Sequence, residues 1–190
     1  MRHHVSSLEI LTLVLVMLAV PLAVYATTKT PTASGSATLK GTVLIPIDLD
    51  LAASLPEAKL FIYASDYTPK AGHAVMPWEA PIIQVIEHPI AALASAGTRH
   101  VPFEFTRLPP GLYGVSVLFD IGKPHVPVTF LERCRARFLI ANPGDYAGGT
   151  EQEIALGAGQ SESVTIDKGF FVPVPKGYQS PLYDHEAGCQ

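Results

Sequence analysis

The residues most able to do chemistry are two histidines and an aspartate on either side of one segment, residues 101–119. His100 precedes this segment, and Asp120 and His125 follow it. No two of the histidines beyond residue 26 have the local spacing of a metal motif such as H-E-x-x-H. A metal site or a small hydrolytic site would therefore require these three side chains to converge in the fold. The alternative is that His100 and His125 are ordinary surface histidines.

The chain has two cysteines, Cys134 and Cys189, a usage that fits an oxidising compartment. The two cysteines either form a disulfide that ties the tail to the rest of the chain, or they do not pair with each other. In the second case the tail carries a free thiol or forms a disulfide with another molecule. Arg133 and Arg135 flank Cys134 and could lower the pKa of its thiol. On a strand, however, both arginines would point away from Cys134, so a structural role is favoured over that of a nucleophile.

The best candidate for binding a partner is the long segment 65–81, which reads SDYTPKAGHAVMPWEAP. Tyr67, Met76 and Trp78 place aromatic and soft apolar groups on this connection, and β-sandwiches commonly use long loops for recognition. The alternative is that Trp78 closes the open end of a sandwich as part of its core.

The N-terminal residues have the layout of a secretory signal peptide, which we expect to span residues 1–26. A short basic start precedes an apolar run, and Val24 and Ala26 suit the positions before a cleavage site. The alternative is an uncleaved membrane anchor, which would be the chain's one contact with a membrane. Residues 27–36 (TTKTPTASGS) then read as a flexible leader. We therefore expect a periplasmic or secreted protein.

The clearest structural signal is the segment 101–119, VPFEFTRLPPGLYGVSVLF. Apolar residues alternate with other residues on both sides of Leu108-Pro109-Pro110-Gly111, so we expect a β-hairpin with a type II turn and positive φ at Gly111. Seven or eight short strands separated by Gly and Pro turns predict an all-β fold, an antiparallel Ig-like or transthyretin-like sandwich over residues 37–172. We expect an N-terminal apolar signal helix before this domain, one helical candidate inside it at residues 90–97, and an irregular tail over residues 173–190.

The formal net charge of −4 comes without a basic patch, so nucleic acid is not an expected partner. The chain has no G-x-S-x-G motif, phosphate loop or dinucleotide fingerprint, and we expect no cofactor and no catalytic residue. Apolar strands with open edges make self-association a further expectation.

The central segment resembles the transthyretin-like, or carboxypeptidase-regulatory-like, family of β-sandwich domains. The resemblance rests on Phe105, on residues 108–113 (LPPGLY) and on the strand that ends at Asp120, with a closing pattern from residue 144 to residue 164. It implies the fold rather than an activity. Where some relatives carry an Asp- and Asn-rich segment, this chain has Ile121, Gly122 and Lys123, which argues against a calcium loop.

Residues 60–64 (LFIYA) and 142–148 (NPGDYAG) are similar to the periplasmic domain of cytochrome c maturation factors that hold apocytochromes. This likeness implies a periplasmic assembly chaperone. The expectation from the sequence is an exported, non-catalytic β-sandwich module that binds a protein or saccharide partner. The alternatives are the chaperone and a metal-binding or small hydrolytic protein with a site near His100, Asp120 and His125.

Overall fold

The computed structural model describes residues 35–51, 56–70, 72–133, 135–167 and 172–179, all within the unit Ser34–Gln190. The predicted signal peptide, most of the predicted leader, Cys134 and Cys189 lie outside the described residues. Within the described ranges, the structure contains no helix with the length and apolar character needed to cross a membrane.

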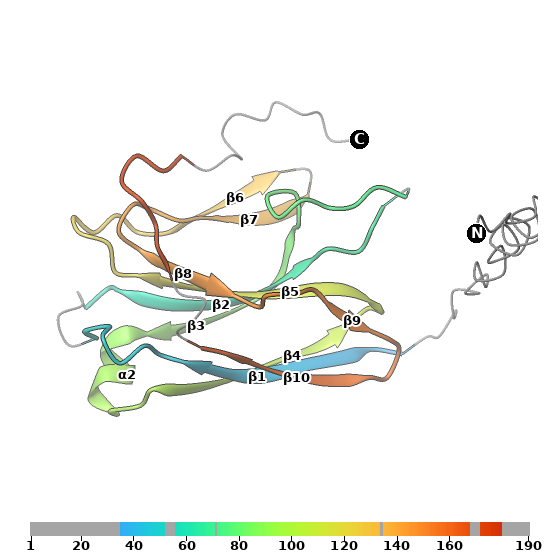
Figure 1. Ribbon diagram of the computed structural model, residues 1–190, viewed down its shortest axis with the longest axis horizontal. Helices are drawn as coiled ribbons and strands as arrows, with labels where there is room; N and C mark the ends of the chain where they lie inside the picture. Colours follow the sequence, from blue (N-terminus) through green and yellow to red (C-terminus); the bar gives the residue numbers. More distant parts are fainter. Residues whose placement is uncertain (1–34, 52–55, 71, 134, 168–171, 180–190) are drawn as a thin grey trace, which may run out of the picture. The chain divides into compact units, whose positions relative to one another are not determined.

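The described part of the chain contains eleven strands and one short helix (Figure 1). The predicted all-β class is confirmed, and residues 90–95 form the predicted helix. The elements in chain order are β1 (Ala37–Leu44), β2 (Lys59–Asp66), β3 (Ile82–Pro89), α2 (Ile90–Ser95), β4 (His100–Leu108), β5 (Gly111–Asp120), β6 (Thr129–Arg133), β7 (Ala136–Ile140), β8 (Tyr146–Gly149), β9 (Ile154–Leu156), β10 (Ser161–Ile166) and β11 (Val172–Pro173).

The strands form two curled sheets in a β-sandwich-like arrangement. The small sheet has the order β10-β1-β4, and the large sheet has the order β11-β8-β5-β2-β3-β7-β6, with β9 added to β5. Neighbouring strands are antiparallel except β1 and β10, which run parallel. The expected purely antiparallel sandwich is therefore corrected at this one pair.

The hydrophobic core lies between the small sheet and the inner face of the large sheet. Because side chains alternate along a strand, one face of each strand supplies the core. The inner face of β2 supplies Leu60 and Ile62, which are fully buried. Helix α2 adds Ile90 and Leu93 to the same cluster. The other large contributors are Leu39 and Val43 from β1, Phe103 and Phe105 from β4, and Tyr113, Val115, Val117 and Phe119 from β5.

The predicted hairpin of residues 101–119 is wrong, although both of its strands exist. Strand β4 pairs with β1 in the small sheet, whereas β5 pairs with β2, β8 and β9 in the large sheet. The segment is thus an arch that carries the chain from one sheet to the other. The turn also differs, because Arg107, with φ of 60°, takes the left-handed conformation expected for Gly111. Gly111 is instead required for space, since a Cβ there would collide with the hydroxyl of Thr68.

Tyr113 stabilises this arch at the start of β5. Its buried side chain donates a hydrogen bond of 2.6 Å from the hydroxyl to the carbonyl oxygen of Pro109, four residues upstream. A buried phenol that bonds to the backbone near the start of a strand fixes the path of the preceding connection, as in the tyrosine corner of other β-sandwiches.

Two segments with no strand pattern in the sequence contain strands. Residues 142–149 include β8, because its glycines allow close approach: a Cβ on Gly149 would lie 2.8 Å from the carbonyl oxygen of Val115. The start of the predicted tail includes β11, which pairs with β8 and is followed by the buried Val174. The expected number of seven or eight strands is therefore too low. The segment 126–140 contains two strands, β6 and β7.

The large sheet curls so that its β6–β7 hairpin lies over the outer face of the same sheet (Figure 1). A single residue pair, Ile82 with Arg137, joins β7 to β3. Phe130 on β6 meets Phe61 on the outer face of β2 edge to face, with ring centroids 5.8 Å apart. The guanidinium of Arg137 lies 3.7 Å from the centre of the Phe130 ring. The hairpin thereby encloses part of the outer face of the sheet.

Candidate binding site

A pocket of about 310 Å³ lies on the outer face of the large sheet, where the curl leaves that face partly covered. Its floor comes from the two central strands, where Tyr63 on β2 pairs directly across from Ser116 on β5. The hydroxyls of these two residues are hydrogen-bonded to each other. Ser65, the next outward-facing residue of β2, extends the floor. The floor is therefore built on strands that have paired neighbours on both sides.

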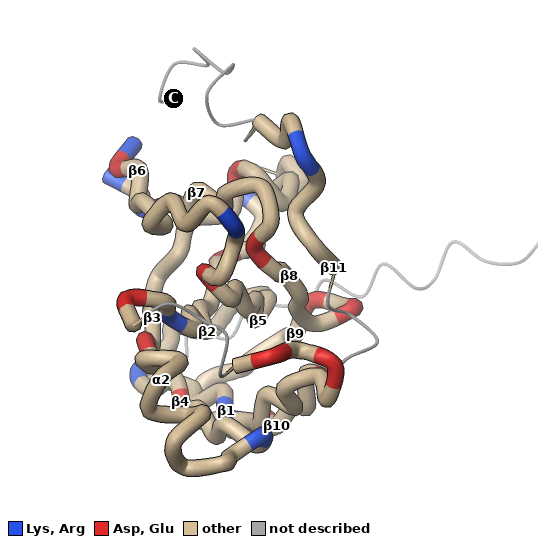
Figure 2. Tube along the Cα trace, turned by 90° about the vertical axis from the view of Figure 1, so that its left-hand side faces the viewer, with Lys and Arg blue, Asp and Glu red and all other residues tan. Residues whose placement is uncertain are grey.

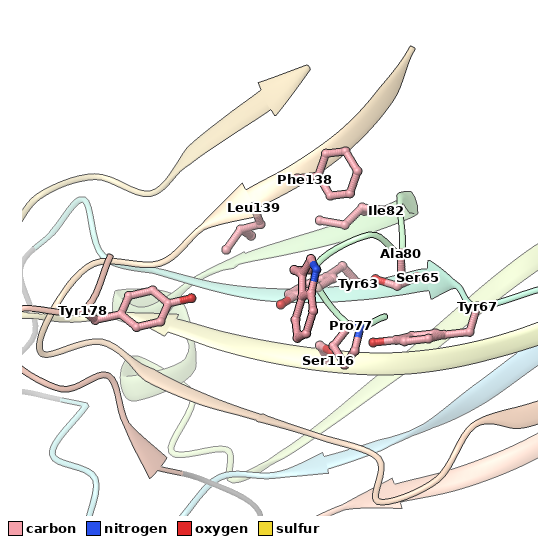
Figure 3. Close-up of a pocket in the computed structure, with 11 residues that line it drawn as sticks. Tyr63, Ser65, Tyr67, Pro77, Ala80, Ile82, Ser116, Phe138, Leu139 and Tyr178 are labelled. Carbon is pink, nitrogen blue, oxygen red and sulfur yellow. The ribbon is translucent and has the colours of Figure 1, made fainter. Parts of the chain in front are cut away.

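Three segments that are distant in the sequence form the walls of the pocket. The loop between β2 and β3 supplies Pro77 and Trp78, β7 supplies Phe138 and Leu139, and the chain after β11 supplies Tyr178. Figure 3 shows Tyr67 and Tyr178 at opposite ends of the pocket, with their hydroxyl groups directed toward its centre. The remaining lining residues are Ala80 and Ile82.

Hydrogen bonds close a tight turn within the β2–β3 loop. The amide N–H groups of Glu79 and Ala80 both donate to the carbonyl oxygen of Met76, at 2.8 and 3.1 Å. The Met76 N–H in turn donates to the Glu79 carboxylate at 3.1 Å. This closed turn presents Pro77 and Trp78, the two residues at its apex, to the pocket. Trp78 remains 37% exposed, so its ring is accessible to a ligand.

Tyr67 is positioned by the adjacent strand. Its amide N–H donates to the carbonyl oxygen of Leu112 at 2.8 Å, and its ring covers Gly114. A Cβ on Gly114 would lie only 2.9 Å from a carbon of that ring. The sequence Tyr-Gly-Val within β5 therefore includes a glycine because a neighbouring aromatic ring occupies the place of its side chain.

The described residues that line the pocket carry no formal charge at physiological pH. None of its eleven lining residues is an acid, a base or a cysteine. Burial raises the pKa of Tyr63 to about 12, against the opposing effect of its hydrogen bond with Ser116. Burial also raises the pKa of Tyr67, and the nearby Glu153 carboxylate adds to this shift. Both phenols thus stay protonated and can donate as well as accept hydrogen bonds.

The structure brings together two of the three residues that the sequence proposed for partner binding. Tyr67 and Trp78 line the pocket, whereas Met76 is 43% exposed on the same loop and does not line it. Sequence reasoning missed Tyr63, Ser116 and Tyr178. For Tyr63 a signal was present: the run LFIYA is apolar at consecutive positions, which indicates that both faces of the strand are covered.

The proposed metal or hydrolytic residues separate into two places. The Nε2 atom of His125 lies 3.2 Å from Oδ1 of Asp120, and its Nδ1 atom lies 3.7 Å from the exposed carboxylate of Glu57. His100 is exposed at the start of β4, in the other sheet. The His125 side chain is only 7% exposed, so a reactant would have little access to it. Among the described residues, no group of three or more His, Cys, Asp or Glu side chains could hold a metal ion.

A second acidic residue near this pair ties three backbone segments together through its carboxylate and its own backbone. Asp145 is fully buried and accepts hydrogen bonds from the N–H groups of Ile121, Gly122 and Asn142, at 3.1, 2.9 and 2.9 Å. Burial raises the pKa of Asp145, and the three N–H donors oppose that shift. The Asp145 carbonyl oxygen also accepts the Val174 N–H at 2.7 Å. This corner therefore anchors the chain that continues to Tyr178 in the pocket.

Charged residues in the described chain are mixed rather than gathered on one element (Figure 2). Comparison with known proteins adds no assignment: no protein-family model matches the chain, and a search of the curated proteins finds no match. The geometry of the pocket is therefore the basis for assigning a function.

Proposed function

We propose that this protein is an exported, non-catalytic module of the transthyretin-like β-sandwich type, and that it binds its partner in the pocket between the β6–β7 hairpin and the large sheet. The observation that carries the proposal is the neutral lining of that pocket, in which aromatic rings and hydroxyls surround about 310 Å³. Ligand sites typically combine an apolar, aromatic lining with a few convergent polar groups. The β4–β5 arch and the Tyr113–Pro109 hydrogen bond support the type of fold.

The chemistry of the lining favours binding over catalysis. A general base must lose its proton near the operating pH, but the raised pKa values of Tyr63 and Tyr67 keep both phenols protonated. The hydroxyls of Ser65 and Ser116 have no histidine or carboxylate beside them in the lining. These groups are suited to holding a partner through hydrogen bonds and ring contacts.

The partner is a protein or a saccharide under this proposal, and an assembly chaperone would be one kind of protein-binding module. The test compares capture from the exported fraction by the wild-type chain and by Trp78→Ala. Ile47→Ala serves as the matched control, because it also truncates an exposed apolar side chain (80% exposed) but lies outside the pocket. Captured material is identified as protein or glycan by mass spectrometry.

The proposal expects the wild type and Ile47→Ala to retain one partner and Trp78→Ala to lose it. Circular dichroism and thermal unfolding must show that Trp78→Ala is still folded. Equal retention by all three chains would place the binding surface elsewhere. A collapse of Trp78→Ala would instead identify Trp78 as part of the core, and Tyr63→Phe, which keeps the ring, would then take its place in the comparison.

A further inference from the structure

We propose that the ligand of this pocket is a neutral saccharide, bound through one or two pyranose rings. The inference rests on the proposed binding function and names its ligand class. Three properties of the pocket lead to it: the hydroxyl groups in its lining, the apolar ring surfaces beside them, and the absence of charge from the described lining residues.

The hydroxyl groups match the hydrogen-bonding character of a sugar. Five lining residues carry a hydroxyl, from both strands of the floor and from both ends of the pocket: Tyr63, Ser65, Tyr67, Ser116 and Tyr178. Each of these groups can donate one hydrogen bond and accept others. Sugar hydroxyls have the same dual capacity, so each side can satisfy the other without leaving a buried donor or acceptor unpaired.

The ring surfaces suit the other half of a sugar. Pyranose rings present faces of C–H groups, which pack against flat apolar surfaces. Trp78, Pro77 and Phe138 supply such surfaces beside the hydroxyl-bearing floor. Trp78 and the tyrosines combine an apolar ring with a polar group, the pairing that an amphipathic ligand requires.

The charge of the site excludes most other small ligands. An anion would lose its water and find no Lys, Arg or His among the described lining residues, and it would lie near Glu153, whose carboxylate raises the pKa of Tyr67. A cation would find no carboxylate among these lining residues. The volume of about 310 Å³ lies at the small end of the usual range for ligand pockets, roughly 300–1,000 Å³. A small neutral ligand fits both the volume of the pocket and the uncharged residues that line it.

An extended peptide fits this site less well than a sugar. Peptides that add to a sheet need a free strand edge, but β2 and β5 are each paired on both sides. The remaining peptide mode is a proline-rich segment against aromatic rings, which makes little use of the hydroxyl groups in the lining. This mode is one outcome of the test below.

The protein offers an internal reporter, because Trp78 is the only tryptophan in the chain. Its fluorescence in the purified full chain would be titrated with four neutral oligosaccharides, namely malto-, cello-, chito- and manno-hexaose. Oligogalacturonate serves as the acidic control, and a proline-rich peptide tests the alternative. We expect a saturable change with at least one neutral oligosaccharide and none with the other two probes.

Two variants test whether the sugar occupies this pocket. Tyr63→Phe and Ser116→Ala each remove one floor hydroxyl and should weaken binding by about tenfold, since each leaves a buried sugar hydroxyl without its partner. Ile47→Ala should bind as the wild type does. Unchanged affinity in both floor variants would overturn the inference, even if a sugar binds. Near-UV circular dichroism verifies that each variant is folded.

The remaining outcomes separate this inference from the proposed function. Binding of oligogalacturonate or of the proline-rich peptide alone overturns the neutral saccharide and leaves the pocket as a binding site. If Trp78 fluorescence changes with none of the probes, but capture of a protein depends on Trp78, the saccharide is overturned and the proposed function is kept. If the fluorescence does not change and Trp78→Ala captures the same material as the wild type, both the saccharide and the proposed binding site are overturned.

Discussion

Replacing Asp145 tests whether one buried carboxylate holds the corner that carries the tail into the pocket. Its two oxygens accept three backbone N–H groups, two on Oδ1 from Ile121 and Gly122 and one on Oδ2 from Asn142. The same residue receives the Val174 N–H on its backbone carbonyl, and that second contact survives any side-chain substitution. A substitution at Asp145 therefore isolates the contribution of its side chain to the free energy of unfolding.

The size of the effect follows from these three bonds. Asp145→Ala leaves the N–H groups of Gly122 and Asn142 without an acceptor, each at a cost of about 1–3 kcal/mol if it stays buried. The Ile121 N–H keeps a second acceptor, the carbonyl oxygen of Phe119 at 3.0 Å. Removing the carboxylate also removes its own burial penalty, which is the cause of its raised pKa. We therefore expect a net loss of about 2–4 kcal/mol in the free energy of unfolding. Asp145→Asn keeps an acceptor for Ile121 and Gly122 but turns an amide N–H toward Asn142, so its loss should be about half as large.

The assay is urea denaturation at pH 7, followed by circular dichroism. Asp120→Asn is the matched control, because Asp120 is also a buried carboxylate in this corner but accepts one backbone N–H, from Val128, at 3.3 Å. The free energy of unfolding of Asp120→Asn should be at most about 1 kcal/mol lower than that of the wild type, or it should be higher. A loss below about 1 kcal/mol for Asp145→Ala, or equal losses for Asp145→Ala and Asp120→Asn, would refute this account of the corner.

Three further predictions concern the arch and the pH dependence of stability. Tyr113→Phe removes the hydrogen bond to Pro109 and should lower the free energy of unfolding by about 1 kcal/mol, or the Tm by roughly 2–4 °C; an unchanged Tm would show that the bond contributes nothing. Arg107→Gly relieves a left-handed backbone conformation at an exposed position and should raise the free energy of unfolding by up to about 1 kcal/mol; a clear loss in urea denaturation would contradict this. Burial raises the pKa of Asp120, so its contribution to stability is complete below about pH 4 and is lost as the pH rises through the raised value. The stability of Asp120→Asn relative to the wild type should therefore increase from pH 3 to pH 7, and a constant or falling difference would exclude this linkage.

The sequence predicted the strands of the arch but not how they pair. Alternation in residues 101–119 shows which side chains are buried, and Phe105 and Val115 are indeed both in the core. The same alternation is satisfied whether two strands share one sheet or face each other from two sheets. The difference depends on the backbone at Arg107, and nothing in the pattern marks an arginine as the residue that takes a positive φ.

The pocket was only partly predictable for a related reason. Trp78 stood out because it lies on a long loop rich in proline. Tyr63 and Ser116 lie on strands that read as core, and their outward position matters only because the sheet curls until β7 reaches over them. Tyr178 enters the pocket through the β8–β11 pairing, a contact between segments that show no strand pattern of their own. Such long-range contacts are set by tertiary packing rather than by local residue preference.

The most direct test of the pocket as the binding site is quenching of Trp78 fluorescence by an external neutral quencher such as acrylamide, measured with and without the captured partner. Trp78 is 37% exposed in the free protein and is the chain's only tryptophan, so the signal reports on this pocket alone. A partner that contributes no tryptophan emission is required, or its tryptophans are subtracted. The account predicts that the bound partner shields Trp78 and lowers the quenching constant. A quenching constant unchanged at saturating partner would contradict it.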